Sequence, residues 1–214
     1  WDMSYMSTIR LEGTSPALES VLRAVGVEGD EAWGAKGKKW RAGTRSLQAW
    51  VFQRADQRRP IAPVTLIWRV EEMAVAGDTS ARPKANTKNR RSILLRIHPS
   101  AFLQLWNELL EVSKRQNPPV TVEDLRFEIG SIEITGPGSV EALISTLHPL
   151  MPDGNAPPTD TPEATWSSLL GVASSASLPQ NALLAFSISD PRLHCPPKTL
   201  KAPFSDAHMN SLAM

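Results

Sequence analysis

Apolar residues recur with a helical period in three segments of the chain, at positions i, i+3, i+4 and i+7. These segments are residues 18–25, 102–109 and 140–147. The spacing places the four apolar side chains of each segment on one side of a helix, which predicts three amphipathic helices packed on a flat apolar surface. Each predicted helix begins at a proline, which suits the first turn because an N–H there has no helical partner. The three prolines are Pro16, Pro99 and Pro137.

Strands are predicted between these helices, where apolar and β-branched residues alternate with polar ones. Val64, Leu66, Trp68 and Val70 share one face of an extended chain, which predicts a strand with one buried face and places Trp68 in the core. The same alternation recurs at Ile93 and its neighbours. The predicted strands are residues 5–11, 47–52, 64–70, 92–97, 122–129, 131–135 and 183–188.

This order of elements predicts an α+β fold, in which mainly antiparallel sheets carry amphipathic helices on one face. The order partly repeats, so two related halves are expected, at residues 1–76 and 90–195. Residues 77–89 are polar and without period, which indicates an exposed loop. A flexible loop is expected near residues 152–162. Residues 196–214 are expected to form an extended tail or a connection to further sequence.

Positive charge is concentrated in residues 36–91. Fourteen Lys and Arg against four Asp and Glu give this segment a net charge of +10, whereas nine against eighteen give the remainder −9. The overall net charge of +1 conceals this division. A segregated block of positive charge favours a polyanionic partner, and the tryptophans within it suit unpaired bases, so RNA is the leading hypothesis.

Nine cations in loops and at strand ends are the predicted phosphate contacts, because such loops can meet at one rim of a sheet. Two tryptophans with polar, glycine-containing surroundings, Trp33 and Trp40, are candidates for base stacking, with packing as the alternative. The predicted RNA contacts are Lys36, Lys38, Lys39, Arg41, Arg45, Arg58, Arg59, Arg90 and Arg91.

No catalytic motif is present in the sequence, and we expect no catalytic residue, bound metal or cofactor. The single cysteine, Cys195, excludes an intramolecular disulfide, and His98 is expected to cap a helix. The turn at residues 136–139, Gly-Pro-Gly-Ser, has two interpretations: a weak anion site at a helix start, or a tight strand-to-helix turn. No apolar run is long enough to predict a membrane span.

Five short motifs occur in order along the chain. Together they resemble the middle region of the largest protein subunit of eukaryotic ribonuclease P and ribonuclease MRP, the Pop-one family. The motifs are Asp2-Met3-Ser4-Tyr5 with Leu11-Glu12-Gly13, Pro63-Val64-Thr65-Leu66-Ile67-Trp68-Arg69, Ile97-His98-Pro99, Ile134-Thr135-Gly136-Pro137-Gly138-Ser139 and Ser189-Asp190-Pro191-Arg192.

The resemblance implies a non-catalytic, RNA-binding scaffold in a nuclear and nucleolar particle that processes precursor tRNA and precursor rRNA. Its partners would be the catalytic RNA and the other protein subunits. Arg192 is then a candidate contact in the particle, with an internal ion pair to Asp190 as the alternative. The family's middle region is also distantly similar to the glycine cleavage T-protein, which concerns fold ancestry and not function.

Two other functions remain open at this point. The chain is alternatively a folate- or anion-binding transferase of T-protein descent, or a platform that docks proteins and binds no RNA. Steep salt dependence of RNA binding favours the scaffold, whereas tight, salt-insensitive folate binding favours the transferase.

Overall fold

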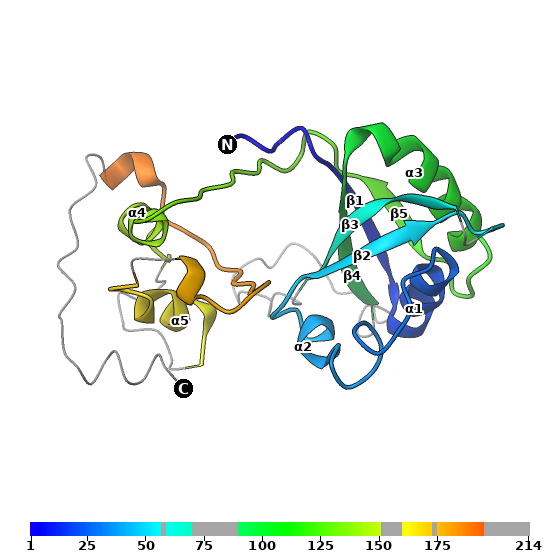
Figure 1. Cartoon of the computed structure of the whole chain (residues 1–214), viewed down its shortest axis with the longest axis horizontal. Helices are drawn as coiled ribbons and strands as arrows, with labels where there is room; N and C mark the ends of the chain where they lie inside the picture. Colours follow the sequence, from blue (N-terminus) through cyan, green and yellow to red (C-terminus); the bar gives the residue numbers. More distant parts are fainter. Residues whose placement is uncertain (57–58, 70–89, 151–159, 173–174, 195–214) are drawn as a thin grey trace, which may run out of the picture. The chain divides into compact units, whose positions relative to one another are not determined.

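The computed structural model describes residues 1–56, 59–69, 90–150, 160–172 and 175–194. The chain forms two compact units, Trp1–Glu133 and Ile134–Met214. Figure 1 shows the elements of both. Among the described helices, none combines the length and apolarity needed to cross a membrane.

The first unit is built on a five-stranded antiparallel sheet with the strand order β2-β3-β4-β1-β5. Val64 lies opposite Ile97, and Leu11 lies opposite Ile93, so the alternating apolar residues of neighbouring strands share one face. The strands are β1 (Ser7–Thr14), β2 (Leu47–Phe52), β3 (Pro60–Trp68), β4 (Arg90–Ile97) and β5 (Thr121–Asp124).

Two helices, α1 (Ser15–Ala24) and α3 (Pro99–Ser113), pack side by side on that apolar face (Figure 1). They form the core with the inward residues of the sheet, and the largest fully buried side chains come from both layers. The opposite face, which we call the open face, carries residues that are half-buried or exposed, apart from the buried Thr8. The fully buried set includes Ile9, Leu11, Leu18, Leu22, Leu66, Ile93, Leu95, Ile97, Leu105 and Leu109.

Local chemistry sets the ends of both helices. His98 accepts a hydrogen bond from the Ser100 amide and Pro99 opens α3, which confirms the predicted cap. After α1 the chain turns at Gly26, whose φ of +89° is accessible to glycine at little cost. A Cβ at Gly26 would lie 2.5 Å from the Phe52 ring, so this position also requires a residue without a side chain.

The second unit contains two short helices, α4 (Ser139–Thr146) and α5 (Pro162–Ser168), and two single-turn 3₁₀ helices, η1 (Ser175–Ser177) and η2 (Pro191–His194). The Trp166 indole donates to the Leu147 carbonyl at 2.9 Å and its ring lies 5.2 Å from that of Phe186. The hydrogen bond connects α5 to the end of α4, and the ring contact connects α5 to the segment that carries Phe186.

The α+β class, the three predicted helices and the placement of two of them on one face of an antiparallel sheet are confirmed. Two predicted strands are wrong. Residues 131–135 and 183–188 each contribute only an isolated bridge, Ile132 with Asp2 and Ile188 with Pro149, because neither has a neighbour to pair along its length.

The strand predicted for residues 122–129 is also too long. It ends at Asp124, whose side chain accepts a hydrogen bond from the Arg126 amide at 2.9 Å. Phe127 then has a φ of +69°, a left-handed conformation that cannot continue a strand. A local turn therefore replaces the second half of the predicted strand.

The structure divides the chain at a different place from the two predicted halves. β3 and β4 lie on either side of residues 77–89 and pair with each other, so both belong to one sheet. The boundary instead falls after Glu133. The segments 77–89 and 196–214 lie outside the described residues, as does most of the loop predicted at 152–162. The similarity to the T-protein fold stays a prediction.

Candidate nucleic-acid interface

The basic loop, residues 36–45, folds onto the core through tryptophan contacts. Trp40 lies in the short helix α2 (Lys38–Arg41), is 3% exposed, and donates its indole N–H to the Leu66 carbonyl at 3.2 Å. Its ring meets Trp33 edge to face at 5.4 Å and lies 5.7 Å from Trp68. Three aromatic rings therefore join the loop to β3.

Two arginines complete this connection. The Arg41 guanidinium donates to the carbonyls of Ala32 and Gly34, and Arg91 donates to the Arg41 carbonyl. The Arg91 guanidinium also lies 4.2 Å from the centre of the Trp68 ring, in cation–π geometry. Both side chains are half-buried and hold the loop in its conformation, and phosphate contact by Arg41 and Arg91 stays a prediction.

The loop closes tightly around Gly37, which is buried. A Cβ at this position would lie 2.1 Å from the Ala32 carbonyl oxygen and 2.7 Å from an Arg41 guanidinium nitrogen. Real Cβ atoms do not approach other atoms so closely, and the nearer obstacle is backbone, which cannot rotate away. Any side chain at residue 37 therefore has to displace the segment that Arg41 holds.

We expect Gly37→Ala to lower the free energy of unfolding by about 1–3 kcal/mol, the usual cost of forcing a methyl group into a packed site. Urea denaturation measures this. Gly34→Ala is the matched control. The atom nearest to its new Cβ is an oxygen of the exposed Asp30 side chain, which can rotate, so a smaller loss is expected. Equal losses for the two variants would contradict the close packing at Gly37.

Three lysines project from this fixed loop. Lys36, Lys38 and Lys39 are exposed, and within the described part of the chain none of their side chains makes an ion pair or a hydrogen bond. Arg45 is half-buried and donates to the Thr44 carbonyl at 3.1 Å. The lysines are thus the predicted contacts whose charge no described protein atom engages, and Arg45 keeps its other N–H groups for a partner.

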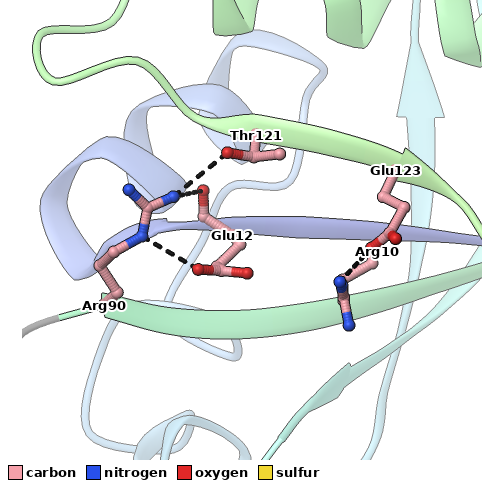
Figure 2. A network of polar contacts seen from close by, with 5 residues as sticks. All are labelled: Arg10, Glu12, Arg90, Thr121 and Glu123. Carbon is pink, nitrogen blue, oxygen red and sulfur yellow. Dashed lines mark hydrogen bonds and ion pairs between the residues drawn. The ribbon is translucent and has the colours of Figure 1, made fainter. Parts of the chain in front are cut away.

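Arg90 lies on the open face in a network that spans β4, β1 and β5 (Figure 2). It pairs with Glu12 at 3.0 Å and donates to the Thr121 hydroxyl at 3.2 Å. The neighbouring Arg10 pairs with Glu123. Carboxylates therefore neutralise the cations on this part of the face, which makes Arg90 a contact within the sheet.

Arg59 lies far from the basic loop. It precedes β3, whereas the loop contacts the other end of that strand, at Leu66 and Trp68. The nine residues of β3 rise roughly 26 Å, so the expectation that these cations meet at one rim is wrong for Arg59. Its side chain is largely exposed and pairs with Asp56 at 3.5 Å. Arg58 lies outside the described residues.

Arg192, in the second unit, forms a two-pronged ion pair with Asp190. Its Nε and terminal nitrogens reach both carboxylate oxygens at 2.6–3.0 Å, as the internal alternative predicted. Hydrogen bonds from the Arg192 side chain hold the pKa of Asp190 below its ordinary value. The guanidinium is 89% exposed, and a contact between Arg192 and the particle stays a prediction.

The sequence reasoning missed the same arrangement at Asp124 and Arg126. Arg126 donates to both carboxylate oxygens of Asp124, and its side-chain hydrogen bonds lower the pKa of that group. The Arg126 guanidinium also lies 4.0 Å from the centre of the Phe102 ring. The pair joins the end of β5 to α3, and its signal in the sequence is the shared pattern Asp-x-Arg.

Base stacking on Trp40 is wrong, because burial between Trp33 and Trp68 leaves no ring face for a base. Trp33 is half-buried, donates to the Val27 carbonyl at 2.7 Å and lies beneath the Arg23 guanidinium. Base stacking on Trp33 stays a prediction. The packing predicted for Trp68 is confirmed by its 2% exposure.

The Gly-Pro-Gly-Ser turn has the conformation that the structural interpretation predicts. Gly136 and Gly138 have φ values of +104° and +79°, and α4 begins at Ser139. An anion at this turn stays untested. Within the described ranges, no three His, Cys, Asp or Glu side chains are grouped as metal ligands.

Known proteins similar to this chain agree with the motifs. No family model matches the chain. The Saccharomyces cerevisiae ribonucleases P/MRP protein subunit POP1 is 23% identical over 206 residues, which cover 93% of the chain and 20% of that protein. The Schizosaccharomyces pombe ribonucleases P/MRP protein subunit pop1 is 28% identical over 142 residues, which cover 66% of the chain and 18% of that protein.

The resemblance to the Pop-one subunit of ribonucleases P and MRP is confirmed. It extends over most of this chain in the first relative and about two thirds in the second. The chain spans about a fifth of the length of the curated relatives it matches.

Proposed function

We propose that this chain is an RNA-binding scaffold segment of a ribonuclease P/MRP protein subunit. The observation that carries the proposal is the group of exposed lysines, Lys36, Lys38 and Lys39, on a loop that the core holds in place. The similarity to the yeast and fission-yeast subunits supports it independently. Neither observation depends on the other.

The loop geometry suits phosphate binding. Arg41 and Arg91 fix the backbone on which the lysines stand, so less conformational freedom of the loop is lost when RNA binds. Lysine ammonium groups attract phosphates without reading bases, because the backbone charge of RNA is the same at every nucleotide. The segment would therefore position RNA by its shape and charge.

In this proposal the chain has no catalytic residue and needs no cofactor, and cleavage belongs to the RNA component. The particle would process the 5′ ends of precursor tRNA and would also act on precursor rRNA, in the nucleus and nucleolus. Further protein subunits would contact surfaces outside the basic loop. The acidic remainder of the chain offers charge complementarity to basic partners.

The salt dependence of binding between this chain and the catalytic RNA of ribonuclease P tests the proposal. We expect the logarithm of the association constant to fall linearly with the logarithm of salt concentration, by roughly 0.7–0.9 for each phosphate contacted. Absent binding at low salt would overturn it. Tight folate binding that does not respond to salt would instead support the transferase.

Activity assays separate the scaffold from an enzyme. Precursor tRNA incubated with excess protein should stay uncleaved until the catalytic RNA is added. Specific cleavage by the protein alone, lost on substitution of a single side chain, would contradict the scaffold assignment.

A further inference from the structure

The open face of the sheet carries an exposed tryptophan at an edge strand. Trp50 is 55% exposed in β2, where Val51 faces the core and is fully buried. Alternation along the strand therefore directs Trp50 to the opposite side from α1 and α3. Its partner across the sheet, Pro63, is also exposed. An indole this large normally buries most of its surface, so its exposure indicates a surface that another molecule covers.

Two further rings lie near the same end of the sheet. Val64 pairs with Ile97, so Pro63 and His98 stand at the next position on their strands. Trp50 and His98 are thus two strands apart, roughly 10 Å. Tyr5, which is 55% exposed, lies edge to face with His98 at 6.2 Å between ring centres.

One cation completes the group, which we call the aromatic surface and define as Tyr5, Trp50, Arg96 and His98. Arg96 donates to the Met3 carbonyl at 3.2 Å, which places the turn that carries Tyr5 beside it. Among the described residues, Arg96 has no carboxylate partner. Four of its five guanidinium N–H groups are thus without a described protein acceptor.

Charge distinguishes this end of the open face from the rest. β2 and β3 contain no charged residue, and β4 contains three arginines and no acid. On the side of β1 and β5, by contrast, Glu12 and Glu123 neutralise Arg90 and Arg10 (Figure 2). The four residues of the aromatic surface thus include one arginine and no acid, and the nearest acid along the chain to Tyr5, Asp2, accepts a hydrogen bond from the Ser4 amide.

We infer that the aromatic surface binds unpaired bases of single-stranded RNA, with Trp50 and Tyr5 as stacking residues and Arg96 as a phosphate or base contact. Aromatic side chains on an exposed sheet are a general means of recognising single strands, because splayed bases stack on them. Polar neighbours such as Gln48 and Thr65 lie on the same face and can hydrogen-bond to base edges, which suits RNA better than an apolar protein surface.

This inference rests on the proposed function and adds a second surface with a different RNA preference. The basic loop contacts β3 at Leu66 and Trp68, whereas Trp50 lies opposite Pro63, toward the other end of that strand. The lysines attract phosphates of any RNA, paired or unpaired. The aromatic surface requires bases that are free to unstack, so duplex RNA cannot use it.

The test compares Trp50→Ala with the unaltered 214-residue chain. Binding to an oligouridine strand and to an RNA duplex of equal length is measured by fluorescence anisotropy at one salt concentration. We expect affinity for the single strand to fall about tenfold, the usual consequence of losing one stacking residue, and affinity for the duplex to stay unchanged. Leu103→Ala, which removes an exposed apolar side chain on α3, is the control and should alter neither affinity.

Three outcomes would overturn the inference. Single-strand affinity equal to that of the unaltered chain is one, and an equal loss for both RNAs is another. The third is unchanged RNA affinity with reduced incorporation into the assembled particle, which would assign the surface to a protein subunit. If Trp50→Ala does not fold, Tyr5→Ala provides the same comparison.

The two RNA proposals fail in different ways. If the unaltered chain binds neither RNA, the proposed function itself is wrong. If alanine at the three lysines of the basic loop weakens both RNAs while Trp50→Ala changes nothing, only the inference about the aromatic surface is wrong.

Discussion

Replacing Trp68 with alanine is expected to lower the free energy of unfolding by about 3–5 kcal/mol, because a large buried ring leaves a cavity that the sheet cannot close. The ring is 2% exposed and contacts the Trp40 ring on one side and the Arg91 guanidinium on another. Its loss therefore removes core packing and loosens the attachment of the basic loop. Urea denaturation, followed by far-UV circular dichroism, measures the change.

Two further variants sharpen this measurement. The Trp68 indole nitrogen is buried and has no hydrogen-bond partner among the described residues, so Trp68→Phe should cost less than Trp68→Ala, since it keeps a ring and removes an unpaired polar group. Trp50→Ala, at an exposed ring, should change stability little. A Trp68→Ala protein as stable as the unaltered chain would show that this ring is not part of the core.

Changing Lys36, Lys38 and Lys39 together to alanine is expected to reduce the slope of log affinity against log salt by about one for each lysine, because each phosphate contact releases condensed counterions. The affinity for unrelated RNA sequences should fall to a similar degree, since phosphate contacts carry no sequence information. The melting temperature should not change, because the three side chains are exposed and make no ion pair or hydrogen bond with other described residues.

A control for this variant removes exposed cations elsewhere. Lys114 and Arg115 follow α3, on the helical side of the sheet, and both are exposed. Alanine at both positions should leave the slope unchanged if RNA lies on the basic loop. An unchanged slope in a folded triple-lysine variant, or an equal reduction in the control, would contradict the assignment of phosphate contacts to this loop.

The prediction of local structure from sequence succeeded where one residue and its near neighbours decide the outcome. The alternation of Val64, Leu66 and Trp68 predicted a buried strand face, and the proline before Ser100 predicted the start of α3. Both predictions use the periods with which side chains change direction, two residues along a strand and 3.6 along a helix, and these periods can be recognised from neighbouring residues alone. The failures at residues 131–135 and 183–188 arise because local pattern is not enough for a strand. A strand exists only where a second strand pairs with it, and that partner is distant in the sequence.

The candidate site was predicted only in part, because the contacts of a charged side chain also depend on residues distant in the sequence. A count of charges locates positive segments, but it does not say which cations have partners. Arg41, Arg90 and Arg91 belong to the same cluster in the sequence as the lysines, yet carbonyls, a carboxylate and an aromatic ring of the fold engage them. The lysines are left exposed because their side chains point away from the core to which the arginines attach the loop.

The tryptophans show the same division between local and long-range information. The sequence alone determined that Trp68 lies on an apolar strand face and that three amphipathic helices exist, since side-chain periodicity is a property of neighbouring residues. It could not determine that Trp40 is buried or that Trp50 is exposed. Those outcomes depend on which face of the sheet α1 and α3 cover and on where the basic loop docks. Contacts between residues distant in the chain decide both, and only the tertiary structure contains them.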